Sequence, residues 1–336
     1  MTSITRELQD CYYRREGHSL DTFCYFLPDG EPLTEEEEIA RLNALGIPPA
    51  YTDVFVSPDP EAALQAFGRD KAGRLQYRYH SDFMQKNAEE KWKRLGKFAD
   101  ALPLLRTESA RDLKRSTLHP RKVLALMTRL LYIARFRVGS DCYVQQHKTY
   151  GLTTLLKRHV KVEGSTVEFK FKGKHSIWQH KVTTDQTLAR NMVRLKELPG
   201  AFLFKAETEQ GIVRLHSHDL NAYIREVMGP FTAKDFRTWG GTLLAAEFLA
   251  EVGLPQSERQ ARKNLTECVK VVAADLGNTP AVVRGHYISP KVFDVYLEGR
   301  ILDDFKLRNQ INSEAHLTES ELALKRLLRA KTGASK

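Results

Sequence analysis

Residues 159–183 have the sequence HVKVEGSTVEFKFKGKHSIWQHKVT, which interrupts a long stretch of helical patterning. Three segments within it alternate with a period of two, and glycine-containing turns separate them. The alternation predicts a three-stranded antiparallel sheet with Lys174 in the turn between its second and third strands. We expect Trp178 and Trp239 to be core residues.

Amphipathic helices are predicted before and after this sheet. The helix over residues 119–139 has Pro120 in its first turn and Gly139 at its end. Another helix follows Thr232 and has Asp235 three residues later, as in a helix cap. The other predicted helices cover residues 81–102, 219–228, 257–277, a short segment from Thr279 and Pro280, and a last segment capped by Thr318 and Glu321.

The first 80 residues mix short strands with one helix. Residues 22–28 and 53–58 are rich in aromatic and β-branched residues and end in proline, which is typical of strands. Between them, Thr34 and Glu37 form a predicted capping box for a helix that ends at Gly46.

The fold class that these patterns indicate is α+β. A small mixed N-terminal domain is predicted over residues 1–90, and a mostly α-helical domain with the three-stranded sheet over residues 91–336. At 336 residues the chain is long enough for two domains that each bury a core.

The charge of the chain is unevenly distributed. Lys and Arg number 52 and Asp and Glu 42, which gives a formal net charge of +10. Residues 1–80 hold 8 basic and 14 acidic side chains, whereas residues 81–200 hold 25 basic and 11 acidic ones. A block this basic indicates a polyanionic partner, most often a nucleic acid, although a solvated basic surface has the same composition.

Several classes of protein are excluded by absent patterns. No apolar run reaches the roughly 18 residues that span a membrane, and the start MTSITRELQD lacks the pattern of a secretory signal. The cysteines form no CxxC pair, so a zinc ribbon and a redox dithiol are not expected. Because neither GxxxxGK(S/T) nor GxGxxG occurs, we expect no bound ATP or dinucleotide. No Asp/Glu cluster of the two-metal kind appears either, so we expect no metal and no other cofactor.

Four basic or polar residues and one tyrosine stand out at the edges of predicted elements. They are Arg137, Lys174, Arg237, Asn278 and Tyr287. Each alone has a plain structural explanation, such as an arginine at a helix end or a lysine in a solvated turn. The set as a whole is more informative than any member.

The sequence resembles the small type IB DNA topoisomerases of bacteria and poxviruses, and the resemblance covers nearly the whole chain. The similar segments are GRDKAGRLQYRYH at 68–80, YGLTTLLKRHV at 150–160, FKGKHS at 171–176, AKDFRTWGGT at 233–242 and LGNTPAVVRGHY at 276–287. The last two, taken together, are a specific signal.

The resemblance implies a tyrosine nucleophile, Tyr287, two arginines, Arg137 and Arg237, a hairpin lysine, Lys174, and a fourth hydrogen-bond donor, Asn278. It implies an ATP-independent topoisomerase that cuts one strand of duplex DNA through a 3′-phosphotyrosyl intermediate, lets supercoils relax and religates. Poxvirus-like and eukaryotic members tend to have histidine at the fourth position. Because an asparagine cannot transfer a proton near neutral pH, Asn278 is expected only to donate a hydrogen bond.

These residue types suit that reaction. Charge builds on the nonbridging oxygens of the pentacoordinate transition state, and arginine forks bind such oxygens bidentately. A free tyrosine has a pKa of about 10, so the nucleophile needs a positive field. The departing 5′-oxygen needs a proton, which Lys174 can supply as general acid.

The resemblance also implies further contacts with double-stranded DNA. The candidate DNA-binding residues are Gln76, Tyr77, Tyr79, Tyr150 and Lys234. The strand that carries the first three could equally be a packed one. The implied protein is a monomer that closes around DNA as a clamp, and we expect it in the cytoplasm with the nucleoid and not at a membrane.

Two other classes remain as alternatives. A tyrosine site-specific recombinase shares the Arg, Lys, Arg, Tyr chemistry, but it usually has histidine three residues before the second arginine, where this chain has Lys234. A non-catalytic basic DNA-binding protein would need no tyrosine within such a set.

Overall fold

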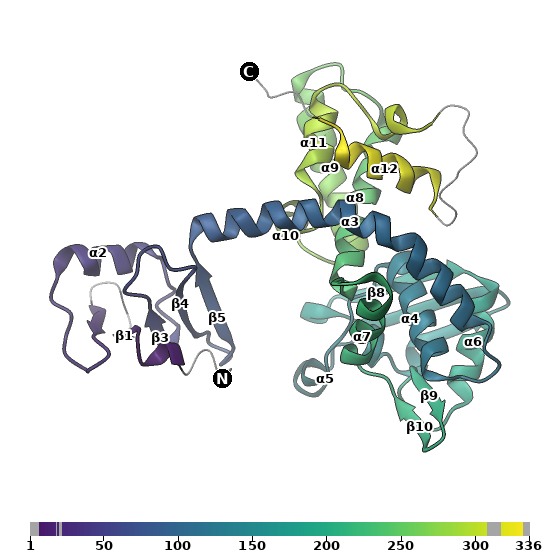
Figure 1. Ribbon diagram of the computed structural model, residues 1–336, viewed down its shortest axis with the longest axis horizontal. Coiled ribbons are helices and arrows are strands. Elements are labelled where there is room, and N and C mark those ends of the chain that lie inside the picture. The colour runs from purple at the N-terminus through teal and green to yellow at the C-terminus, as the bar shows by residue number, and fades with distance from the viewer. Residues whose placement is uncertain (1–6, 18, 20–21, 308–316, 332–336) are drawn as a thin grey trace. The chain divides into compact units, whose positions relative to one another are not determined.

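The chain forms two compact units, Met1–Lys91 (unit 1) and Trp92–Lys336 (unit 2), each with its own hydrophobic core. The division falls within one long helix, α3 (Ser81–Leu113) (Figure 1). The computed structural model describes residues 7–17, 19, 22–307 and 317–331.

Unit 1 is built on a five-stranded antiparallel sheet in the order β2-β1-β3-β4-β5. Its elements are β1 (Tyr13–Glu16), β2 (Cys24–Phe26), α2 (Glu36–Ala44), β3 (Thr52–Val56), β4 (Leu64–Arg69) and β5 (Leu75–Tyr79). Leu42 of α2 packs with Tyr25 and Val56 of the sheet, and all three are buried. The strands predicted at 22–28 and 53–58 are confirmed as β2 and β3.

The start of α2 differs from the sequence prediction. The capping box of Thr34 with Glu37 is wrong, because the N-cap residue is Glu35 and its side chain makes no capping hydrogen bond. Three acidic residues occupy the first turn instead, where the helix dipole favours negative charge. Glu38, one of the three, is bound by Arg41 at 2.6 Å.

Unit 2 is mostly helical, and α8 runs between its other helices (Figure 1). The helices beyond α3 are α4 (Pro120–Ala134), α5 (Asp141–His147), α6 (Gln186–Glu197), α7 (Ser217–Met228), α8 (Ala233–Val252), α9 (Glu258–Leu276), α10 (Pro280–His286), α11 (Pro290–Leu297) and α12 (Glu319–Arg329). Phe98 of α3 packs against Phe236 and Trp239 of α8, with ring centroids 5.0 and 5.9 Å away. Trp239 is thus a core residue, as predicted.

The three-stranded sheet is present as β6 (Val160–Glu163), β7 (Thr166–Lys172) and β8 (Trp178–Thr184), all antiparallel. A two-stranded sheet, β9 (Lys205–Thr208) with β10 (Gly211–Arg214), was not predicted. The core prediction for Trp178 is wrong, because its side chain is 60% exposed. Strand β8 turns its apolar Trp178 and Val182 outward and its polar Gln179 and Lys181 inward. The reason for this reversal is the polar site that β8 faces.

Two helix ends also differ from the sequence prediction. Helix α4 ends at Ala134 and not at Gly139, because Arg135 adopts the left-handed conformation (φ 53°). Helix α3 continues to Leu113 with Pro103 inside it. By contrast, the cap at the start of α8 is confirmed, since the Asp235 carboxylate accepts from the Thr232 N–H at 2.8 Å.

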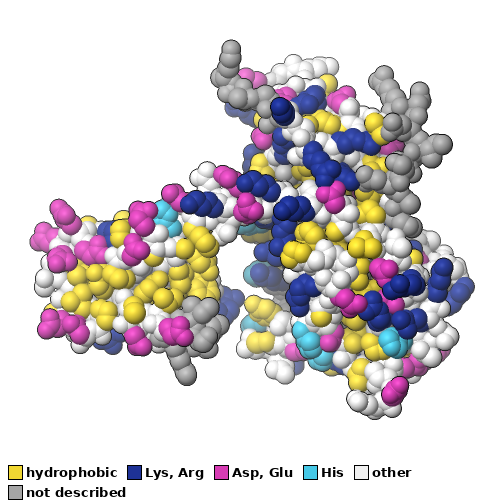
Figure 2. Space-filling model, viewed as in Figure 1, with side chains coloured by type: hydrophobic (Ala, Val, Ile, Leu, Met, Phe, Trp, Pro, Cys, Tyr) yellow, Lys and Arg dark blue, Asp and Glu magenta, His cyan; other side chains and the backbone are white. Residues whose placement is uncertain are grey.

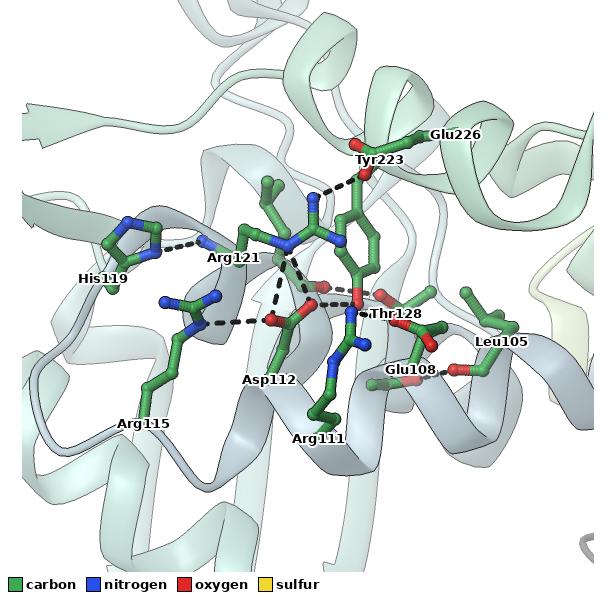
Figure 3. Close-up of polar contacts among 12 residues, drawn as sticks. Leu105, Glu108, Arg111, Asp112, Arg115, His119, Arg121, Thr128, Tyr223 and Glu226 are labelled. Carbon is green, nitrogen blue, oxygen red and sulfur yellow. Dashed lines mark hydrogen bonds and ion pairs between the residues drawn. The ribbon is translucent and has the colours of Figure 1, made fainter.

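A buried carboxylate joins α3, α4 and α7 (Figure 3). Asp112 accepts from Nε of Arg115 at 3.1 Å, from Nε of Arg121 at 3.1 Å and from the Tyr223 hydroxyl at 3.0 Å. Burial alone would raise the pKa of Asp112, but these hydrogen bonds and the Arg121 charge lower it. The charged carboxylate therefore stabilises the packing of three helices.

The charge division of the sequence is visible on the surface (Figure 2). Lys and Arg side chains are spread over the face of unit 2 in this view, and Asp and Glu side chains surround the apolar face of unit 1. Among the described residues, no helix is long and apolar enough to cross a membrane.

Candidate active site

Candidate residues converge at the C-terminal end of α9. Gly277 follows α9 in the left-handed conformation (φ 61°) and ends the helix, whose last carbonyl groups then point outward. Arg137 Nη2 donates to the Gly277 carbonyl oxygen at 2.7 Å, and Arg237 Nη2 donates to that of Leu276 at 2.9 Å. Both guanidinium groups are thus held at the negative end of a helix dipole.

Arg237 lies in the second turn of α8 and is only 5% exposed. It also donates through Nη1 to the Arg135 carbonyl oxygen and through Nη2 to Oδ1 of Asn278, both at 2.6 Å. Its buried Nε–H has no acceptor within the part of the chain that the structure describes. Burial lowers the pKa of Arg237, and the nearby Tyr287 phenol opposes this. The side chain joins three segments and keeps one donor unused.

Tyr287 lies at the C-terminal end of α10, where its N–H donates to the Val283 carbonyl oxygen at 2.9 Å. The Arg237 Cζ atom lies 5.2 Å from the centroid of its ring. Gly241 of α8 permits this approach, because a Cβ there would lie 2.8 Å from the Tyr287 carbonyl oxygen. Thr242 Oγ1 donates to the same oxygen at 3.3 Å. The second glycine of AKDFRTWGGT therefore allows the end of α10, which carries Tyr287, to pack closely against α8.

Three charged residues of the site were missed by the sequence analysis. Asp275 of α9 binds Arg135 through Nε at 2.6 Å and Lys181 of β8 through Nζ at 2.9 Å. Burial lowers the pKa of Lys181, and Asp275 opposes this. Gly240 leaves room for Arg135, since a Cβ there would lie 2.6 Å from its Cδ. In the sequence, only the placement of Lys181 on the inward face of β8 could have indicated that this cluster exists.

A small cavity lies within this cluster, and Arg137, Arg237, Lys181 and Tyr150 are among its lining residues. Burial lowers the pKa of Arg137 to about 10, Arg237 adds to the effect, and Tyr287 opposes it. Arg137 therefore stays charged at neutral pH. Such a concentration of cations suits a phosphate group. The described residues contain no group of three or more His, Cys, Asp or Glu that could hold a metal ion.

Lys174 is the candidate that the structure does not bring into the cluster. It lies in a short 3-10 turn, Lys174–Ser176, between β7 and β8, and its side chain is exposed. Within the described residues, no hydrogen bond or ion pair joins its ammonium group to the other four candidates. His175 and Ser176 have φ of 60° and 59°, a conformation that costs a non-glycine residue free energy.

The predicted DNA-binding residues of unit 1 lie on β5. Tyr77 and Tyr79 are 42% and 41% exposed, and their ring centroids are 6.2 Å apart in a stacked pair. Phe83, at the start of α3, continues the row at 5.5 Å from Tyr79. Gln76 instead donates to the Asp70 carboxylate at 2.9 Å. The two tyrosines are thus on the surface, whereas Gln76 holds a turn.

The other two predicted DNA-binding residues lie in unit 2. Lys234 is exposed on α8, three residues before Arg237, so both side chains are on the same face of the helix. Tyr150 packs edge-to-face on His159 with ring centroids 4.5 Å apart.

Comparison with known proteins gives two family matches. The catalytic core of eukaryotic DNA topoisomerase I matches residues 80–296, and the N-terminal domain of bacterial DNA topoisomerase IB matches residues 22–70. DNA topoisomerase 1B of Acanthamoeba polyphaga mimivirus is 33% identical over 305 residues, which are 88% of this chain and 90% of that protein. DNA topoisomerase 1B of Vaccinia virus (strain Copenhagen) is 22% identical over 272 residues, 78% of this chain and 83% of the viral protein.

The mixed α+β fold and the cluster of two arginines beside a tyrosine suit an enzyme that acts on phosphodiesters. The comparisons make the assignment specific. The chain belongs to the type IB DNA topoisomerase family, and the recombinase alternative is not favoured.

Proposed function

We propose that Tyr287 attacks a phosphodiester of duplex DNA and that this chain relaxes supercoils without ATP. The phenolic oxygen forms a bond to phosphorus and loses its proton to water. The bond from phosphorus to the 5′-oxygen breaks, which leaves a 3′-phosphotyrosyl ester and a 5′-hydroxyl. Because the ester retains the bond energy of the diester, the reverse attack by the 5′-hydroxyl rejoins the strand.

One observation carries this proposal: Arg137, Arg237 and Asn278 meet at the end of α9, and the Tyr287 ring lies 5.2 Å from the Arg237 Cζ atom. The two guanidinium groups bind the nonbridging oxygens and stabilise the charge of the transition state. The buried Nε–H of Arg237, which has no acceptor among the described residues, can also donate to a phosphate oxygen. A buried donor without an acceptor costs about 1–3 kcal/mol, so this hydrogen bond would favour phosphate binding.

Lys174 is the proposed general acid that protonates the 5′-oxygen. Its exposed position in the β7–β8 turn leaves the side chain able to reach bound DNA. General acids need to meet their substrate only in the bound complex, where catalytic hydrogen bonds tighten. The role therefore depends on how DNA positions this turn.

Unit 1 is proposed to bind the duplex through the exposed Tyr77 and Tyr79 on β5. In this proposal the protein acts as a monomer, and the two units form a clamp on DNA. Lys234 and Tyr150 add contacts beside the active site. The double variant Tyr77→Ala/Tyr79→Ala should bind DNA more weakly and keep its Tm, because both side chains are exposed.

Incubation of a supercoiled plasmid without ATP or magnesium tests the activity. The wild-type chain should relax it and leave a covalent adduct on a denaturing gel, whereas Tyr287→Phe should bind DNA and do neither. A covalent adduct in Tyr287→Phe would overturn the assignment of the nucleophile. Strand exchange that requires paired sites would indicate a recombinase instead.

A further inference from the structure

A second cavity, of about 460 Å³, lies beside the active-site cavity. Tyr150 and Phe171 line both cavities, so the two share a wall. We define the basic pocket as this second cavity with its four cations and two aromatic residues. These are Lys148, Arg158, Lys170, Lys172, Tyr150 and Trp178.

The basic pocket is built at the edge of β7 beyond the end of β6. The pairing of β6 with β7 ends at Val160 and Phe169, and beyond it the Tyr150 N–H donates to the Lys172 carbonyl oxygen at 2.8 Å. Lys172 and Trp178 are direct partners in the β7–β8 register, with Nζ 5.7 Å from the ring centroid. This pair forms the base of the turn that carries Lys174.

The four cations of the basic pocket are exposed, and within the described residues none of them forms an ion pair with a carboxylate. Other lysines of the same sheet do: Lys161 binds Glu163 at 2.6 Å, and Lys181 binds Asp275 at 2.9 Å. Like charges around one cavity repel one another, so an anion placed among them is favoured.

His159 lines the same cavity and supplies a neutral donor. Its Nδ1 accepts from the Leu156 N–H at 3.1 Å, so the ring proton of the neutral form is on Nε2. Burial, together with the charge of Arg158, lowers the pKa of His159 to about 4. At neutral pH the ring therefore adds a hydrogen-bond donor without adding charge.

We propose that the basic pocket binds a second phosphodiester of DNA, close to the one that Tyr287 attacks, and thereby positions the Lys174 turn. This inference rests on the proposed function. The shared wall with the active-site cavity favours a phosphate of the same bound DNA over a free one. Lys170 and Lys172 lie on β7 and Trp178 lies on β8, the two strands that flank the Lys174 turn. A phosphate bound by these residues therefore holds both strands where the turn begins and ends. The exposed face of Trp178 can contact the sugar or base next to that phosphate.

Binding is measured in the Tyr287→Phe background, so that cleavage does not enter the result. Duplexes carry one neutral methylphosphonate at successive positions around a single cleavage site. With the intact basic pocket, at least one position besides the scissile one should weaken binding about tenfold, as loss of a charge-assisted contact does. In the Lys170→Ala/Lys172→Ala variant, a methylphosphonate at that position should not weaken DNA binding further. The lysines and the phosphate charge are the two partners of one interaction, and removing either partner already abolishes it.

Salt dependence and fluorescence give two further readouts. The slope of log K against log salt should fall by about 0.9 for each phosphate that the double variant no longer neutralises. Trp178 is exposed, whereas Trp239 is buried and Trp92 is partly buried against the core, so DNA should quench Trp178 and the quench should be lost in Trp178→Phe. Lys161→Ala is the matched control, because this lysine of the same sheet lies outside the basic pocket.

Three results would overturn the inference. In the first, each methylphosphonate weakens DNA binding by the double variant as much as it weakens binding by the intact pocket, while the wild type relaxes plasmid normally. That result would refute the pocket and leave the proposed function intact. Inorganic phosphate could quench Trp178 at micromolar concentration while the double variant binds DNA normally, which would indicate a site for a free anion. If the wild type neither binds nor relaxes DNA, the proposed function fails and this inference fails with it.

Discussion

Arg237 donates a hydrogen bond from Nη2 to Oδ1 of Asn278 at 2.6 Å, which fixes the amide of Asn278 with its oxygen toward the arginine. The NH₂ group then points away from Arg237 and is free to donate to a phosphate oxygen. Asn278 therefore supplies a hydrogen-bond donor whose direction is fixed and whose side chain stays neutral.

Asn278 can be tested by two substitutions of different charge. Asn278→Ala removes the donor and should slow single-turnover cleavage by about 10²-fold, as loss of one such donor does elsewhere. Asn278→Asp should be slower still, because the carboxylate pairs with Arg237 and repels the phosphate. If Asn278→Asp cleaved as fast as the wild type, the amide would have no donor role.

Gly241 should be needed for the position of the nucleophile. In Gly241→Ala the new Cβ meets the Tyr287 carbonyl oxygen at 2.8 Å, so the end of α10 must shift and cleavage should fall at least about tenfold. Gly96→Ala is the matched control, because Gly96 is also inside a helix and a Cβ there meets nothing within 4 Å. That control should keep full activity and gain up to about 1 kcal/mol of stability. Equal cleavage rates in the two variants would argue against this steric role.

The two arginines should differ in their effect on stability. Arg137→Ala and Arg237→Ala should each slow cleavage by about two or more orders of magnitude, and lysine should restore little, since the fork geometry is lost. Arg237→Ala should also lower the Tm, because it leaves the Arg135 and Leu276 carbonyl oxygens without this donor. Thermal melts beside cleavage assays separate the two effects. A Tm that falls equally in both variants would contradict the structural role assigned to Arg237.

Asp112 should stabilise the protein in a pH-dependent way. Its pKa in the folded protein is lowered, so its contribution is complete above about pH 4, the pKa of an unfolded aspartate, and is lost as the pH falls. Asp112→Asn should cost about 3 kcal/mol at pH 7, and the difference from wild type should shrink at pH 3. Urea unfolding at both pH values measures this. Asp303→Asn is the control, because Asp303 forms an exposed pair with Lys306 and should change stability by under about 1 kcal/mol.

The sequence was sufficient where local pattern decides the structure. Period-two alternation gave β6, β7 and β8, and the caps at Thr232 and Thr318 mark real helix starts. The residues that converge on α9 were named from motifs, although their contacts join positions about 140 residues apart, such as Arg137 and Gly277.

Two of the failures share one physical cause, which is long-range contact. Helix α4 stops at Ala134 because Arg135 turns away to bind Asp275, a residue that no local pattern connects with it. Trp178 is exposed because the inward face of β8 serves the polar site through Lys181. In both places, burial of a polar cluster overrides the preference that the local sequence expresses.

Lys174 gives the sharpest test of mechanism. If it protonates the departing 5′-oxygen, its loss should matter only when that atom needs a proton. With sulfur in place of the bridging 5′-oxygen, the leaving group is a thiolate, and a thiol such as cysteine has a pKa of about 8.5, far below that of an alcohol. Lys174→Ala should therefore cleave the sulfur-bridged strand at nearly the wild-type rate and the normal strand very slowly.

The arginine variants supply the contrast for this experiment. Arg137→Ala and Arg237→Ala should stay slow on the sulfur-bridged strand, because the nonbridging oxygens still develop charge. Equal slowing of Lys174→Ala on both strands would make Lys174 a residue that positions DNA from the β7–β8 turn. The proton would then have to come from another cation of the site, and Arg137, with its pKa lowered by burial to about 10, is the next candidate.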